Sequence, residues 1–450
     1  MPAGLVAGLI IVAGLVTGPE SAGQLVPVEP LAARARRAGL RVLAGRHLIL
    51  ATDRPARDGD GVEDLPAVFD QAFEVWCGHY GMRPADHADW RCFGCLMADR
   101  ERFRAAGLLD DTVPPFVNGF CDRNRFWLVD QSNPAYRRHL LLHEGVHAFT
   151  LTLRRLATPV WYNEGVAELL ATHRLDSDGG GLRLVPTPVP DRPEDVEQLG
   201  RIEEIGKLRE AGRAPSLVEV LGLPVGNHGS IADYATSWAA VALLAGHPRY
   251  AAAFADLERG RLDPDFNRRL AGIPGWDAEL AARDFDAFTA DIDYGWDFER
   301  MAIDWSPGQP LAGSREIAVD ASRGWQNSGI RLAAGEGYAM AASGRVGVGS
   351  VTDEADGTTT PLESEPDGIS LQWYRGRPVG RLLAGQWVTP AEGGRPRFEV
   401  VGEGRQADVS PLVDGPLFFK VNQAPGRLAD DSGAYRVELR PLVPPAAGRR

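Results

Sequence analysis

The sequence predicts an α+β domain followed by an all-β sandwich. Its 450 residues suffice for two or three domains at about 100 to 200 residues each. Strand-like and helix-like segments are mixed up to about residue 300, which is typical of an α+β domain. From Trp296 onward Gly and Pro separate short β-prone runs, and we expect a sandwich over residues 310–441.

The N-terminus predicts export. Residues 1–16 are apolar, in the length range of a signal-peptide core and short for a membrane span. We expect residues 1–23 to be a signal peptide and the protein to be secreted, periplasmic or cell-surface. An uncleaved membrane anchor is the alternative, because no Lys or Arg precedes the apolar run. Residues 24–39 are expected to be an exposed linker.

Charge and cysteine content narrow the class of protein further. A net charge of -13 argues against a nucleic-acid partner, because such proteins need a basic footprint. All four cysteines lie between residues 77 and 121, and an even count in an exported chain predicts two disulfides. A zinc knuckle or redox pair at Cys92 and Cys95 is the alternative, although a second Cys-x-x-Cys is absent.

The α+β domain is expected over residues 40–300. Strands are predicted at 46–52 and 125–130, with a helix at 65–80 between them. Three further helices are predicted at 134–156, 161–172 and 231–245, the first starting at an Asn-Pro signal. The Gly-, Pro- and Asp-rich segment 175–193 is expected to be a loop or lid.

The first of these helices contains His143-Glu-Gly-Val-His147. Residues four apart share one helix face, so both imidazoles can reach one zinc ion at about 2.0 to 2.1 Å. Glu144 is then placed beside the ion, where a carboxylate can act as general base. His139, one turn earlier, is interpreted as structural.

A third ligand is predicted on the next helix. Glu164 follows His147 after 16 intervening residues, and Glu168 lies one turn further on the same face. A catalytic zinc takes three protein ligands and leaves one position open, so Glu164 completes the set. Glu168 is placed to accept the free N–H of a ligating histidine. Chance histidines and a solvated acidic helix face are the alternative interpretation.

The two motifs together resemble the gluzincins, above all the aminopeptidase N family with its W-x-N-E-G-x-A-E helix, and more loosely thermolysin. This resemblance implies a zinc metallopeptidase fold that cleaves a peptide or protein substrate. It also implies that Tyr234, in Tyr234-Ala-Thr-Ser-Trp238, stabilises the oxyanion of the reaction. The ligand spacing is shorter than in the aminopeptidases and a G-A-M-E-N-like strand is absent, which argues against aminopeptidase activity. Residues 40–260 look closer to poorly characterised bacterial gluzincin-like proteins.

Segments of the C-terminal region resemble bacterial galactose-binding lectin-like sandwiches, including Gly324-Trp-Gln-Asn-Ser-Gly-Ile330 and Phe418-Phe-Lys-Val-Asn422. The resemblance implies a Ca²⁺ ion and carbohydrate held by Asn422, Asp430 and Asp431, since calcium prefers oxygen ligands. A plain structural sandwich is the alternative, because Asp and Asn are also common in turns. For the whole chain, the alternative to a zinc peptidase is a cell-surface carbohydrate-binding protein with an idle metallopeptidase-like domain.

Overall fold

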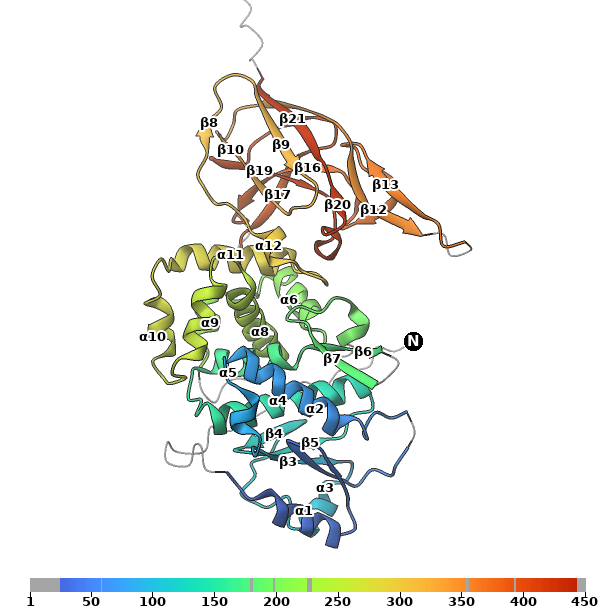
Figure 1. Ribbon diagram of the computed structural model, residues 1–450. Helices are drawn as coiled ribbons and strands as arrows, with labels where there is room; N and C mark the ends of the chain where they lie inside the picture. The colour runs from blue at the N-terminus through green and yellow to red at the C-terminus, as the bar shows by residue number, and fades with distance from the viewer. Residues whose placement is uncertain are drawn as a thin grey trace, which may run out of the picture. The chain divides into compact units, whose positions relative to one another are not determined.

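The chain folds into two compact units. The computed structural model describes residues 25–57, 59–178, 181–196, 199–224, 229–352, 356–391 and 394–442. Unit 1 comprises Met1–Glu210 and Pro215–Phe285, and unit 2 comprises Ala211–Ala214 and Asp286–Arg450. Unit 1 mixes strands and helices, whereas unit 2 is rich in strands (Figure 1). The predicted signal peptide, residues 1–23, lies outside the described residues.

Unit 1 contains a five-stranded sheet in the order β1-β2-β3-β5-β4. Its strands are β1 (Arg41–Ala44), β2 (Leu48–Thr52), β3 (Cys92–Met97), β4 (Gly119–Asp122) and β5 (Arg125–Val129). The three central strands run parallel, and β1 and β4 pair antiparallel at the two edges. All residues of β2 and β3 are buried, as expected for strands covered on both faces. Strand β4 lies at one edge of this sheet, and within the described part of the chain no strand pairs with its outer side.

Helices lie before and between the strands of the five-stranded sheet and make up most of the middle of the chain. They are α1 (Val28–Arg37), α2 (Leu65–His79), α3 (Arg100–Ala105), α4 (Pro134–Leu153), α5 (Val160–Ala171), α6 (Arg201–Glu210), α7 (Leu217–Leu221), α8 (Ile231–Gly246), α9 (Ala251–Arg259), α10 (Phe266–Ala271), α11 (Ala278–Asp291) and α12 (Phe298–Met301), with short 3-10 turns at Pro84–His87 (η1), Pro193–Val196 (η2) and Pro425–Arg427 (η3). The four predicted helices are confirmed as α2, α4, α5 and α8.

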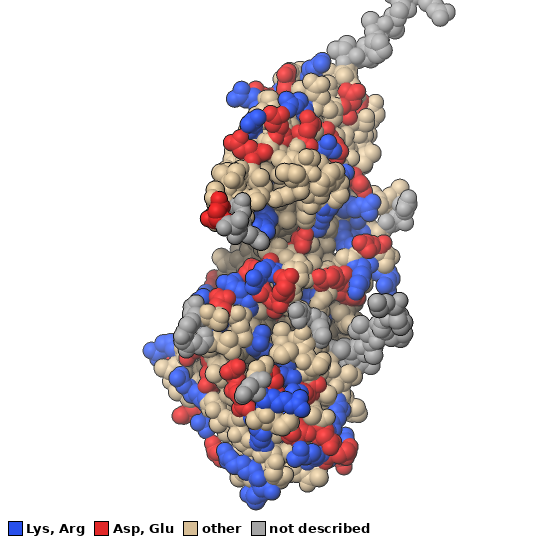
Figure 2. Space-filling model, turned by 90° about the vertical axis from the view of Figure 1, so that its right-hand side faces the viewer, with Lys and Arg blue, Asp and Glu red and all other residues tan. Residues whose placement is uncertain are grey.

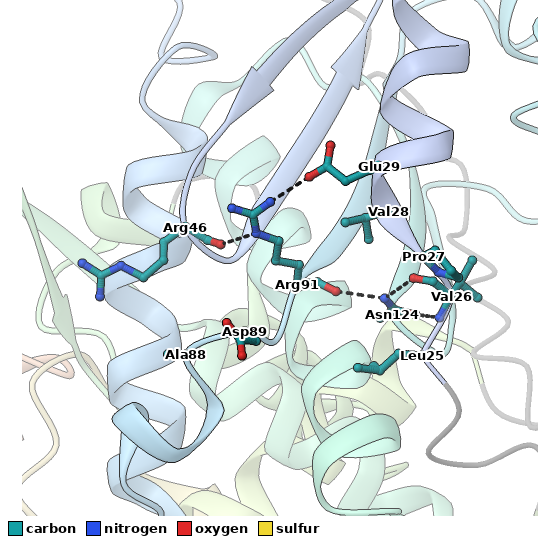
Figure 3. A pocket seen from close by; sticks show the side chains of 10 residues that line it. All are labelled: Leu25, Val26, Pro27, Val28, Glu29, Arg46, Ala88, Asp89, Arg91 and Asn124. Carbon is teal, nitrogen blue, oxygen red and sulfur yellow. Dashed lines mark hydrogen bonds and ion pairs between the residues drawn. The ribbon is translucent and has the colours of Figure 1, made fainter.

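The expectation of an exposed linker over residues 24–39 is wrong. This segment contains α1, which buries Val28, Ala32 and Ala35 in the core beside the sheet. Just before α1, the side-chain amide of Asn124 accepts from the Val26 amide at 2.8 Å and donates to its carbonyl at 3.0 Å (Figure 3). The buried residues of α1 are small or branched, and the adjacent Arg34, Arg36 and Arg37 made the segment resemble an exposed linker in the sequence.

The expectation of an irregular loop or lid at 175–193 is also wrong for most of its length. Strands β6 (His173–Asp178) and β7 (Gly181–Pro186) pair antiparallel as a hairpin. The hairpin is attached to α2, because the Gln71 amide donates to Leu182 O and accepts from Leu184 N, both at 2.9 Å. Polar residues on these partly buried strands obscure the apolar alternation that marks a strand in the sequence.

The two predicted disulfides are absent, and the four cysteines are free and buried. Strand β5 lies between β3 and β4, so Cys121 lies two strands, about 9.5 Å, from the cysteines of β3. Cys92 and Cys95 are three residues apart on one strand and point to opposite faces. Burial raises the pKa of the Cys95 and Cys121 thiols, which keeps them protonated and unreactive.

Unit 2 is a β-sandwich. Its strands are β8 (Gln309–Pro310), β9 (Arg315–Asp320), β10 (Gln326–Leu332), β11 (Tyr338–Ser343), β12 (Val346–Thr352), β13 (Thr359–Ser364), β14 (Ile369–Tyr374), β15 (Arg377–Val379), β16 (Leu382–Val388), β17 (Arg397–Glu403), β18 (Gln406–Val409), β19 (Gly415–Val421), β20 (Asp431–Ser432) and β21 (Ala434–Pro441). The two larger sheets have the orders β17-β16-β19-β10-β8 and β18-β11-β21-β9. One apolar core contains residues from both, including Ile330, Tyr338 and Phe419. Short β-prone runs of the sequence, for example Gly329–Leu332 and Leu417–Val421, lie within β10 and β19.

The second unit begins earlier than residue 310, because residues 286–301 attach to the sandwich through buried charges. Asp291 accepts from Trp325 Nε1 at 3.1 Å and lies 3.7 Å from Lys420 Nζ. Arg395 forms two hydrogen bonds with Asp286, at 2.8 and 2.6 Å.

Acidic and basic side chains are interspersed over the face drawn in Figure 2. Within the described residues, we find no helix both long and apolar enough to cross a bilayer.

Candidate metal centre

Helix α4 carries the two histidines of the motif on one buried face. It begins at a Pro-initiated turn in which the Asn133 side chain accepts from the Tyr136 amide at 2.9 Å. Gly145 allows the helix to approach α2, because a Cβ at this position would lie 2.5 Å from the Phe69 ring and 2.7 Å from the Trp76 ring. The glycine within the motif is therefore explained by helix packing.

Helix α5 brings Glu164 to these histidines. It also packs closely against α8, because a Cβ on Gly165 would lie 2.4 Å from the Ser237 carbonyl oxygen. This contact lets the backbones of α5 and α8 lie side by side, with Glu164 on one helix and Tyr234 on the other.

His143, His147 and Glu164 form a compact buried triad. The two Nε2 atoms are 3.1 Å apart, and Glu164 Oε2 lies 3.5 Å from His143 Nε2 and 3.4 Å from His147 Nε2. Tetrahedral zinc at about 2.0 to 2.1 Å from its ligands would separate them by about 3.4 Å. All three residues are at most 2% exposed. The triad is consistent with a zincin-like metal site.

Unpartnered polar atoms indicate that the triad fits a cation. Neither carboxylate oxygen of Glu164 has a hydrogen-bond partner, although both are buried. Such atoms are costly unless something satisfies them. Burial disfavours the charged form of Glu164, yet His147 and His143 hold its pKa well below the usual range. An anionic carboxylate facing two imidazole nitrogens is the donor set that zinc prefers.

Glu144 lies beside the triad with both carboxylate oxygens buried and without a hydrogen-bond partner. Burial raises the pKa of this carboxyl above its usual range. Strand β4 passes directly alongside, since a Cβ on Gly119 would lie 2.3 Å from Glu144 Oε1. The carboxylate thus has room only because position 119 is glycine.

Glu168 lies on the Nδ1 side of His143, opposite the Nε2 atom that faces Glu164. Its Oε1 lies 3.2 Å from His143 Nδ1, and its Oε2 lies 3.3 Å from His139 Nε2. Burial opposes ionisation, but Arg201 and the two histidines keep the pKa of Glu168 well below its usual range. His139, His143 and Glu168 form a second group with metal-ligand spacing. Arg201 pairs with both oxygens of Glu168, which disfavours a second cation there.

Tyr234 is buried next to the triad, with its ring 6.0 Å from that of His143. Burial and the nearby Glu164 and Glu144 raise its pKa well above the usual range, so the hydroxyl keeps its proton.

Two residues next to the triad, Arg201 and Gly119, were not predicted from the sequence. A cation in the first turn of a helix opposes the helix dipole, and this signal could have drawn attention to Arg201.

The predicted calcium residues lie near the end of β19 and the start of β20. The Asn422 amide nitrogen donates to three backbone carbonyls, those of Tyr374, Arg377 and Pro378, at 3.0 to 3.1 Å. Asp430 is exposed, whereas burial raises the pKa of Asp431 to about 7. Asp431 Oδ2 has no hydrogen-bond partner. The amide group of Asn422 thus has a structural role, and calcium or sugar binding stays a prediction.

Comparisons with known proteins give little beyond this geometry. No family model matches the sequence, and no curated protein matches it. One similar solved structure is described as "EclA N-terminal domain; PllA-like lectin". It is 22% identical, the alignment covers 29% of this chain and 98% of that chain, and the TM-score is 0.20. A TM-score this low supports no conclusion about function.

Proposed function

We propose that this chain is an exported zinc metallopeptidase of the gluzincin type. The observation that carries the proposal is the buried triad, whose three ligand-to-ligand distances of 3.1 to 3.5 Å suit one tetrahedral zinc ion. His143, His147 and Glu164 would hold the ion. Bound zinc supplies Lewis acidity and makes a water molecule acidic near neutral pH.

Glu144 is proposed as the general base and then the general acid. Its unpartnered oxygens can accept a proton from the attacking water. Its raised pKa favours transfer of that proton to the leaving amine, because a catalytic pKa close to the working pH serves both steps. Tyr234 keeps its hydroxyl proton and is proposed to donate a hydrogen bond to the developing oxyanion.

The unpaired edge of β4 is proposed as the place where substrate lies. An extended peptide can add to such an edge through main-chain hydrogen bonds, and Gly119 brings this edge against Glu144. A peptide bound there would present its backbone carbonyls to the centre regardless of side-chain identity.

The test combines zinc analysis with a peptidase assay on the purified protein. We expect one zinc per chain and cleavage of a quenched fluorescent peptide library. Glu144→Gln should lower kcat by about 10² to 10⁴-fold and keep the zinc, since the residue is not a ligand. Tyr234→Phe should lower kcat by about 10² to 10³-fold. Glu101→Gln, at an exposed position far from the motif in sequence, serves as the control.

Two outcomes would contradict this proposal. A protein that binds no zinc would remove its basis. Bound zinc without cleavage of any peptide would favour the alternative, a carbohydrate-binding protein with an idle metallopeptidase-like domain, and binding to a glycan array would support that alternative. Export is proposed from the apolar residues 1–16, and detection of the protein only in the cytoplasmic fraction would contradict it.

A further inference from the structure

Arg201 is a buried cation that the zinc motif does not account for. It is the first residue of α6, and its side chain is only 12% exposed. The N-terminal turn of a helix disfavours a positive charge. Burial also disfavours the charge, so the contacts made by the guanidinium must stabilise it.

Those contacts are made with Glu168 through both carboxylate oxygens. Arg201 Nη2 donates to Oε1 at 2.8 Å and Arg201 Nε donates to Oε2 at 3.0 Å. Each oxygen also has one imidazole neighbour, His143 for Oε1 and His139 for Oε2. The forked pairing therefore holds the carboxylate in the one orientation in which Oε1 faces His143 Nδ1.

The same guanidinium also lies over the ring of Tyr234, with its carbon 5.4 Å from the ring centroid. A cation at this distance from an aromatic face is attracted to it, more strongly when both are desolvated. Arg201 thus contacts one residue behind the metal ligands and one residue beside them.

We propose that Arg201 is a positioning residue of the metal centre. It orients Glu168, which in turn fixes the ring of His143 so that Nε2 faces His147 and Glu164, and it places the Tyr234 ring. This inference rests on the proposed zinc site and adds a residue that no part of the motif includes. Arg201 does not itself contact the reacting atoms.

The test measures zinc affinity in the full-length protein by competition with a chromophoric chelator. Arg201→Met should raise the Kd for zinc by about 10 to 100-fold, the usual cost of losing a group that orients a ligand. Arg201→Lys should give a smaller increase, because a point charge cannot form the fork. Arg192→Met is the matched control, since the Arg192 side chain is 65% exposed and pairs with Asp195, three residues along the chain. Its Kd should equal that of the wild type.

A double-mutant cycle separates positioning from a general effect of charge. If Arg201 acts through Glu168, the pair Arg201→Met and Glu168→Gln should bind zinc no more weakly than Glu168→Gln alone. Fully additive losses would overturn the inference, as would an unchanged Kd in Arg201→Met. If Arg201→Met does not fold, Arg201→Lys decides in the same way. A wild type without zinc overturns both proposals, whereas zinc-binding wild type with an unaffected variant overturns only this one.

Discussion

Glu144 and Gly119 illustrate how a single missing methyl group can shape the centre. The Glu144 carboxylate occupies the space that a side chain at position 119 would need. Replacing Gly119 by Ala should displace this flexible side chain while leaving the triad untouched. We expect a loss of peptidase activity of at least about 10²-fold, because a general base must lie within hydrogen-bond reach of its proton.

Zinc content and thermal stability distinguish this effect from misfolding. Both should stay close to wild type in Gly119→Ala, because the only atoms within 3.0 Å of the added Cβ belong to the Glu144 side chain. Full activity in this variant would show that Glu144 does not act in the orientation described above.

At the scale of elements, the contact between α5 and α8 joins the helix that carries Glu164 to the helix that carries Tyr234. Gly165→Ala would place a methyl group 2.4 Å from the Ser237 backbone and 2.6 Å from Val241. Because backbone cannot move aside cheaply, we expect a loss of about 1 to 3 kcal/mol in the free energy of unfolding, measured by urea denaturation.

Gly78→Ala provides the matched control for this prediction. Gly78 lies near the end of α2, and nothing lies within 4 Å of the Cβ it would gain. Ala is a better helix former than Gly, so this variant should be stabilised by about 0.5 to 1 kcal/mol. Equal effects of the two substitutions would contradict the close contact between α5 and α8.

The elements that carry the centre could be predicted because their signals are local. An Asn-Pro start and apolar helical spacing indicated α4, and two acids one turn apart indicated the functional face of α5. The buried triad of His143, His147 and Glu164 follows from these two helices. The interaction of Arg201 with Glu168 joins residues 33 positions apart without any shared motif, so sequence alone could not reveal it.

The failed predictions also have physical reasons. Cysteine count predicted bridges, but the strand order decides which thiols can meet, and β5 separates β4 from β3. Residues 24–39 were expected to be an exposed linker, although α1 buries Val28, Ala32 and Ala35 in the core of unit 1. In both cases tertiary packing overrode composition.

At the scale of the whole molecule, unit 1 should lose stability in acid through His173. Burial and the neighbouring Arg138, which donates to His173 Nε2 at 2.6 Å, lower the pKa of this histidine from 6.5 to about 3. Between pH 6.5 and about pH 3, His173 is protonated in the unfolded chain but neutral in the folded chain. The contribution of His173 to the free energy of unfolding is therefore complete above pH 6.5. It falls by up to about 1.4 kcal/mol for each pH unit between pH 6.5 and about pH 3.

Urea unfolding at pH 7.5 and pH 5 would measure this loss. His173→Gln keeps a donor and an acceptor but cannot titrate, so its stability should depend less steeply on pH than that of the wild type. His87→Gln, in the partly exposed η1 turn, should retain the wild-type pH dependence. An equal pH dependence of the free energy of unfolding in wild type and His173→Gln would contradict this prediction.

The depth of the triad has one more consequence. The three residues of the triad are at most 2% exposed, so an ion held between them could leave only when a local opening of the fold separates their side chains. The rate of metal release would then be limited by the rate of this local opening, and it would stop increasing as more chelator is added. A loaded molecule would keep its ion long after entering surroundings where the metal is scarce.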